Sequence, residues 1–327
     1  MTKLISNKGY LGFCKQTSRT HPASAPEHYV RYTEAKFVPD QATTVLKEGG
    51  DGEYAKTVIK NSHKEKFSFK CAARPELVAY VLAYLLGDDS KSGGSDPYTH
   101  TIIRGTSRLW LTLWRKIKDL VVQRVEGAKI STVTIEGEAG KEITLAVEGE
   151  GCWGTVLGSE TIPTYETSAP FVFYHGNGRF KNDGAVTSEI KKFSIKIAVK
   201  GEALQTDDVV PGDIPDQALD IDVKLELYAA SSAEWKKANY NNGASVSSGI
   251  YMGSMELDLQ YTESAKIRQL KITIPNMTWQ SIDIPMAGNP EPVTQEIAGI
   301  AVKNSADELI TVVCKNDLSA TLADAGS

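Results

Sequence analysis

The chain has 327 residues, 41% of them hydrophobic and 24% charged, and a formal net charge of −5 at pH 7. This length predicts two domains of ordinary size, and the composition is that of a folded protein. The mild negative charge argues against a protein that holds nucleic acid on a basic face, because neutralising phosphates takes clustered Lys and Arg. The longest apolar run is far shorter than the roughly 20 residues that span a bilayer, and residues 1–8 contain no apolar signal segment.

The first 66 residues contain one clear strand signal. Residues 1–27 are polar with scattered Gly and Pro, which predicts an irregular arm. Residues 28–38 alternate with period two, which predicts a strand that ends at Pro39. Residues 39–66 have little apolar patterning, and a connection of that length is usually functional or disordered.

Residues 66–87 carry the strongest local pattern in the chain. The segment 67–71 alternates apolar and polar residues and predicts a strand that buries one face. Pro75 suits the first turn of a helix, nearly all the following residues to Leu86 are apolar, and Gly87 predicts the C-terminal cap. A helix without a polar side must be covered, either by the chain's own sheets or by another copy of the protein.

The rest of the first half predicts further strands. A flexible loop at 88–97 precedes strands at 99–103 and 109–117. Residues 129–136 and 142–148 flank a short Gly-containing turn and predict a hairpin.

The second half repeats this order of elements. Its predicted parts are a strand at 193–197, a long connection at 200–218, a strand at 221–227, a helix at 231–238 capped by Ser231 or Ser232, a strand at 255–259, and two segments, 266–272 and 296–302, that align with 129–135 and 142–147. We interpret the repetition as a tandem duplication, although such echoes also occur in any all-β chain. The resulting division is an N-terminal arm (1–27), a first domain (28–152), a linker (153–188), a second domain (189–316) and a C-terminal tail (317–327).

Several phrases, in this order, resemble the major tail tube protein family of long-tailed bacteriophages. The resemblance covers about residues 29–316, and no single phrase in it is diagnostic. The phrases are Arg74–Leu77, the helix end at Gly87, Thr99–Ile103, Gly127–Gly137, Pro170–Tyr174 and Phe193–Ile197.

This resemblance implies a mainly β fold of two tandem β-sandwich domains, each with one flanking α-helix. It also implies a structural virion protein, not an enzyme, without a cofactor, that assembles in the host cytoplasm into the phage tail. Its copies would form rings, three two-domain chains or six chains each, which stack into a tube that conducts viral DNA into the host cell. The implied partners are other copies of the chain, the tape measure, the tail terminator, the baseplate or tip proteins, and double-stranded DNA in transient, non-specific passage, with no membrane.

Two groups of residues are candidates for these roles. The lumen-lining candidates are polar positions of the two predicted hairpins: Thr132, Thr134, Glu136, Thr144, Glu148, Lys271 and Thr273. A neutral or acidic lumen would repel phosphates, but a register shift of one residue would exchange every candidate, and a solvated outer face is the alternative. The inter-ring candidates are Tyr54, Val58 and Ile59 in the first long connection, with an ordinary surface loop as the alternative.

No catalytic, cofactor or metal motif is present. The chain lacks Cys-x-x-Cys, His-Glu-x-x-His, phosphate-loop and Gly-x-Ser-x-Gly patterns, and its five histidines are scattered. Four isolated cysteines, Cys14, Cys71, Cys152 and Cys314, are predicted to be reduced, buried thiols. The enzymatic alternative is a β-sandwich glycosidase that uses Glu136 and Glu138, and the third class is a carbohydrate-binding sandwich with Trp110, Trp114 or Trp153 as stacking surfaces. Asp207, Asp208, Asp213 and Asp216 could hold calcium or form a solvated acidic loop.

Overall fold

The protein is mainly β, as the sequence predicts. The structure is a computed structural model that describes residues 9–46, 57–117, 121–158, 163–173, 180–186, 190–229, 232–280, 282, 284 and 292–323. The first half contains β1 (Gly9–Gln16), β2 (His28–Val30), β3 (Tyr32–Leu46), β4 (Thr57–Ala72), α1 (Pro75–Leu86), β5 (Gly87–Ser92), β6 (Tyr98–Arg104), β7 (Trp110–Ile117), β8 (Val121–Glu138) and β9 (Thr144–Leu157). The second half contains β10 (Phe180–Asn182), β11 (Ala185–Val186), β12 (Ile190–Val199), β13 (Leu219–Tyr228), α2 (Ala233–Tyr240), β14 (Met252–Glu263), β15 (Lys266–Trp279), β16 (Thr294–Ala301) and β17 (Thr311–Asn316).

Seven strands form an antiparallel sheet that we call the long sheet. Its order is β3–β4–β9–β8–β12–β13–β16, so strands from both halves of the chain lie in one sheet. The two halves meet where β8 pairs with β12, with Ile135 opposite Ile195. Because side chains alternate between the two faces of a strand, one face of this sheet is apolar and the other polar.

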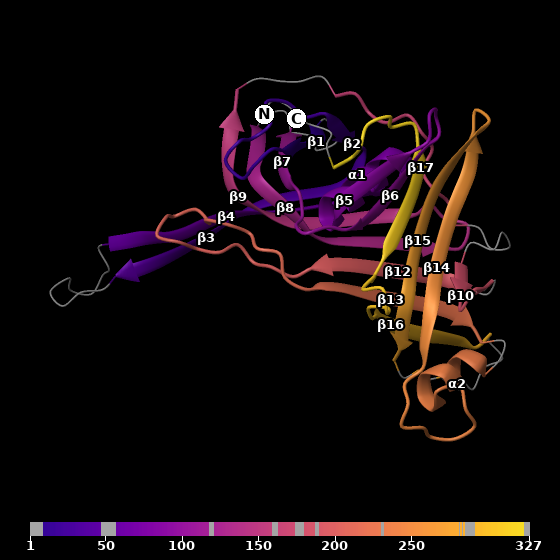
Figure 1. Ribbon diagram of the computed structural model, residues 1–327. Coiled ribbons are helices and arrows are strands. Elements are labelled where there is room, and N and C mark those ends of the chain that lie inside the picture. Colours follow the sequence, from indigo (N-terminus) through magenta and orange to yellow (C-terminus); the bar gives the residue numbers. More distant parts are fainter. Residues whose placement is uncertain are drawn as a thin grey trace.

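A second group of strands crosses the long sheet on its apolar side (Figure 1). Its order is β11–β10–β14–β15–β17–β6–β5, and we call it the crossing sheet. Strands β2, β1 and β7 extend from the N-terminal part of β8. The apolar side chains between these layers form one core cluster that includes residues from both halves. The division into tandem domains therefore remains a prediction, since the described core is continuous.

Helix α1 lies inside this core and is covered by the chain's own strands. Eleven of its twelve residues are buried, and they contact β5, β6, β8, β15 and β17. The helix ends as predicted at Gly87, whose φ of 94° suits a residue without a side chain and whose N–H donates to the Ala83 carbonyl. At its other end Arg74 makes no side-chain cap. Instead the carboxylate of Glu166 accepts hydrogen bonds from the N–H groups of Glu76 (3.0 Å) and Leu77 (3.2 Å).

Helix α2 differs from α1 in that none of its residues is buried. It starts at Ala233, two residues later than predicted. Ser232, one of the two predicted caps, occupies the N-cap position, but its side chain makes no capping hydrogen bond. Ser231 lies outside the described residues. Neither described helix is long and apolar enough to cross a membrane.

Three segments predicted to be irregular contain strands. Strand β3 continues through Pro39 to Leu46 and pairs with β4 from Thr57, so the first long connection is mostly a hairpin. Proline is tolerated there because, among the described strands, β3 pairs with β4 alone and lies at the sheet edge. The predicted loop at 88–97 contains β5. The N-terminal segment 1–27, predicted to be irregular, contains β1, which pairs along β7.

Candidate functional site

The polar face of the long sheet brings five of the lumen-lining candidates together. Thr132, Thr134 and Glu136 lie on β8, where they alternate with residues buried in the core. Across the β8–β9 pair, Thr132 faces Glu148 and Glu136 faces Thr144. The register that the sequence could not settle thus places all five on one polar, solvent-facing surface.

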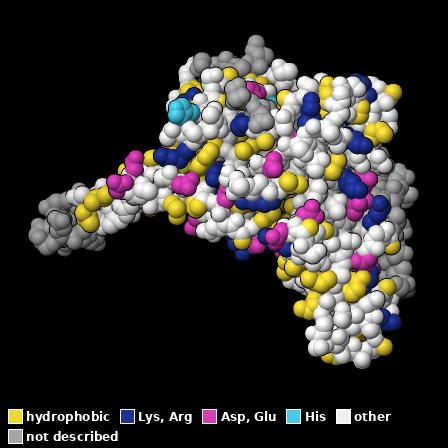
Figure 2. Space-filling view, in the orientation of Figure 1, with side chains coloured by type: hydrophobic (Ala, Val, Ile, Leu, Met, Phe, Trp, Pro, Cys, Tyr) yellow, Lys and Arg dark blue, Asp and Glu magenta, His cyan; other side chains and the backbone are white. Residues whose placement is uncertain are grey.

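Charged side chains of both signs surround these five residues. Lys192 lies opposite Glu138 on one side and Glu226 on the other, and Lys196 lies opposite Asp222. Carboxylates outnumber lysines on this face of β8, β9, β12, β13 and β16. The carboxylates are Glu136, Glu138, Glu148, Glu150, Asp220, Asp222, Glu226 and Glu296, and the lysines of β12 and β13 there are Lys191, Lys192, Lys196 and Lys224. Figure 2 shows lysine and carboxylate side chains interspersed between the projecting hairpin of β3 and β4 and helix α2.

The other two lumen-lining candidates lie elsewhere. Lys271 and Thr273 are on β15 in the crossing sheet, between β14 and β17. Lys271 forms an ion pair with Glu256 of β14 (Nζ–Oε2 2.7 Å). The sequence aligned residues 266–272 with 129–135, but this part of β15 pairs with β14 and β17, not with strands of the long sheet.

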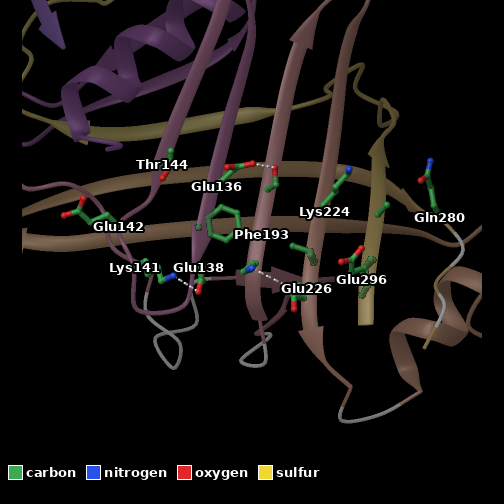
Figure 3. Close-up of a pocket in the computed structure, with 16 residues that line it drawn as sticks. Glu136, Glu138, Lys141, Glu142, Thr144, Phe193, Lys224, Glu226, Gln280 and Glu296 are labelled. Atoms are coloured by element: carbon green, nitrogen blue, oxygen red, sulfur yellow. Dashed lines mark hydrogen bonds and ion pairs between the residues drawn. The ribbon is translucent and has the colours of Figure 1, made fainter. Parts of the chain in front are cut away.

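A shallow groove of about 760 Å³ occupies one end of the polar face (Figure 3). Among its carboxylates, Glu138 pairs with Lys141 at 2.8 Å and Glu136 accepts a hydrogen bond from the Ser194 hydroxyl at 3.4 Å. The hydrogen bond from Lys141 holds the pKa of the Glu138 carboxyl below its ordinary value, which is the reverse of what a catalytic acid needs. None of the described residues lining the groove is a tryptophan. Glu138 therefore does not suit the acid role in the glycosidase alternative, and Trp110, Trp114 and Trp153 do not line the groove.

The hairpin of β3 and β4 projects from the body of the protein (Figure 1), and we call its outer part, 39–46 and 57–64, the arm. Strand β9 accompanies β4 only as far as Glu65, so the arm continues as a two-stranded ribbon. Val58 is 65% exposed and Ile59 45% exposed, and Figure 2 shows hydrophobic side chains near the outer end of the arm. Tyr54, the third inter-ring candidate, lies outside the described residues.

A buried charge cluster at the base of the second long connection was missed by sequence reasoning. The Arg108 side chain is 0% exposed and its Nε bonds to Asp216. Lys129 lies 3.6 Å from the same carboxylate and over the ring of Trp110. Burial raises the pKa of the Asp216 carboxyl, but hydrogen bonds and charge from Arg108 outweigh burial and keep it below its ordinary value. Asp216 is thus neutralised by protein cations, which does not fit the calcium alternative.

The four cysteines and His100 are further titratable groups that are buried in the protein. All four cysteines are free and buried, as predicted, and burial raises their thiol pKa values, that of Cys152 to about 11. His100 is fully buried between Asp89 (3.1 Å) and the Leu318 carbonyl (3.0 Å). Within the described ranges no group of His, Cys, Asp and Glu could hold a metal ion.

Comparison with known proteins adds one finding. A family model for phage tail tube proteins matches residues 6–301, nearly the whole chain. The search of curated protein sequences found no match to this chain. The family is one of structural proteins. Because the match covers far more than half of its length, the chain belongs to the phage tail tube protein family.

Proposed function

We propose that this protein forms stacked rings that build the tube of a phage tail, and that the tube conducts viral DNA into the host cell. Family membership places the protein in the virion tail as a structural component. The proposal also includes assembly in the host cytoplasm and contacts with the tape measure, the tail terminator and the baseplate or tip proteins. The observation that carries the proposal is the long sheet, which has a core on one face and a continuous polar surface on the other.

The polar face is proposed to line the lumen. DNA must slide through a tube without binding, and a surface with more carboxylates than lysines repels phosphates while its paired charges offer no basic patch. Thr132, Thr134, Glu136, Thr144 and Glu148 are the residues proposed to face the DNA. Lys271 and Thr273 lie on another sheet and are not part of this proposed surface.

Two similar units per chain are proposed to give a ring of three chains with six-fold-like symmetry. The pairing order β3–β4–β9–β8 recurs as β12–β13–β16–β15, which supports a tandem duplication. The two units meet edge to edge at β8 and β12, while β3 pairs with β4 alone among the described strands. An unpaired edge of this length is a template for another chain. Six units with about four strands each, spaced ~4.8 Å and tilted ~45°, give a wall with a diameter on the order of 50 Å.

The arm is proposed to connect one ring to the next. It projects beyond the sheet and carries Val58 and Ile59 in solvent, where an isolated chain gains nothing from apolar side chains. Contact with a neighbouring ring would bury these residues and order the arm.

Shortening residues 47–60 tests this proposal. The shortened protein should fold and form rings but should not form tubes, as seen by electron microscopy and sedimentation. The matched control is Val246→Asn, which removes an apolar side chain that is 84% exposed beside α2, and it should polymerise normally. Normal tubes from the shortened protein would contradict the role of the arm. A solitary particle that binds sugar at high concentration would contradict the tube itself.

A further inference from the structure

The second long connection, residues 200–218, is an ordered two-legged loop beside the arm (Figure 1). Its legs are joined by backbone hydrogen bonds from Leu204 N–H to the Asp213 carbonyl (2.8 Å) and from Gly212 N–H to the Leu204 carbonyl (2.9 Å). We call this segment the brace. Hydrogen bonds join it to the arm and to the long sheet.

The base of the brace is fixed to the body by buried cations. Arg108 donates from its backbone N–H to Asp216 Oδ2 (2.7 Å) and from Nη2 to the Pro215 carbonyl (2.9 Å). Lys129 Nζ donates to the Ile214 carbonyl (2.8 Å). Arg108 Nη1 also donates to the Ile130 carbonyl of β8 (3.0 Å), so the guanidinium joins the brace directly to the long sheet.

The outer part of the brace holds the arm at the point where β9 leaves it. Strand β4 pairs with β9 up to Glu65, and two residues further out the His63 N–H donates to the Val209 carbonyl of the brace (2.8 Å). Glu150 of β9 adds a second link, because its carboxylate accepts from Lys64 Nζ of the arm (2.9 Å) and from the Ala203 N–H of the brace (3.3 Å). The brace thus takes the place of a third strand beside the arm.

A two-stranded hairpin alone is marginally stable in water, and a third neighbour is what stabilises it. We propose that the brace fixes the direction of the arm, and that Arg108 and Asp216 are the positioning residues that fix the brace. This inference concerns the single chain, and only its consequence for ring stacking rests on the proposed function.

The test removes the tip of the brace and leaves its base. Residues 206–210 are replaced by two glycines in the full-length protein, which deletes Val209 while Arg108, Lys129 and Asp216 keep their contacts. Amide hydrogen exchange followed by mass spectrometry should show exchange roughly two- to tenfold faster in the arm, the effect of losing one ordinary hydrogen bond. The control Val209→Ala retains the carbonyl and should exchange like the wild type. Unchanged protection of the arm in the shortened variant would overturn the inference.

Asp216→Asn tests the positioning residues in the same assay. If Asp216 acts through the brace, protection falls more in the arm than in β14 and β15, whose mutual pairing involves no residue of the brace. An equal fall in all these strands would show a purely global role and would refute the assignment. Tube growth is measured separately. Faster exchange in the arm together with normal tubes would support the role of the brace and refute the role of the arm in stacking.

Discussion

Asp216→Asn should also destabilise the whole protein, because it removes the anion between two buried cations. The Arg108 side chain is 0% exposed and that of Asp216 9% exposed, so water replaces little of the lost charge. Breaking a buried ion pair by removing one partner costs about 3–5 kcal/mol. Burial already lowers the pKa of Lys129, so this amine can release its proton and relieve part of the repulsion. We therefore expect a loss at the lower end of that range, about 3 kcal/mol in the free energy of unfolding.

Urea unfolding followed by circular dichroism measures this loss. The matched control is Asp220→Asn, four residues along, whose carboxylate is 41% exposed and pairs with Lys200 at 2.6 Å. This exposed pair should be worth less than about 1 kcal/mol. A double-mutant cycle with Arg108→Met should give a coupling free energy above roughly 1 kcal/mol, because the two residues lie in direct contact. If Asp216→Asn costs no more than the control, or if the two changes are additive, the buried pair is not what fixes the brace.

Two further predictions concern α1 and its surroundings. Leu85 is 0% exposed, so Leu85→Ala should lower the free energy of unfolding by about 2–5 kcal/mol. Leu85→Asp should leave insoluble or unfolded protein, because it buries a charge. A soluble, folded Leu85→Asp variant would contradict the burial of this helix. Burial raises the pKa of Glu166 to about 7 and that of Glu76 to about 8, so the folded protein binds more protons than the unfolded chain from about pH 4.5 up to these values. Burial lowers the pKa of His28 to about 4, so between about pH 4 and pH 6.5 the unfolded chain binds more protons at this residue than the folded protein does. This histidine therefore opposes the effect of the two carboxyls on stability only below about pH 6.5. The free energy of unfolding should therefore fall between pH 6.5 and 8, less steeply in Glu166→Gln, and a melting temperature that rises over this range would refute the assignment.

The parts of the fold that the sequence predicted are those with a local signal. Pro75, the apolar run to Leu86 and Gly87 together define α1, because each acts within one or two turns of the helix. The hairpin of β8 and β9 was predicted for the same reason, since its strands alternate cleanly and are joined by a short turn. Five lumen-lining candidates share one face because the period-two pattern is a property of each strand by itself.

The parts that the sequence missed depend on distant contacts. The outer arm has no apolar alternation because both of its faces are exposed, so nothing in residues 39–46 separates a strand from a loop. Arg108 and Asp216 are 108 positions apart, and neither residue type is expected in a core. Lys271 and Thr273 were assigned by analogy with 129–135, but the pairing partners of a strand are chosen by the whole fold.

The buried pair of Arg108 and Asp216 is better explained by position than by stability. Replacing a buried ion pair with apolar residues of similar volume is often neutral or stabilising, so stability alone gives no reason to place two cations and a carboxylate here. An apolar contact, however, has no preferred direction, whereas the guanidinium joins the Ile130 carbonyl of β8 to the Pro215 carbonyl of the brace in one fixed plane. The triple variant Arg108→Met, Lys129→Met and Asp216→Leu separates these effects, because it leaves no buried cation without its carboxylate. It should unfold at a urea concentration close to that of the wild type while its arm still exchanges amide hydrogens faster.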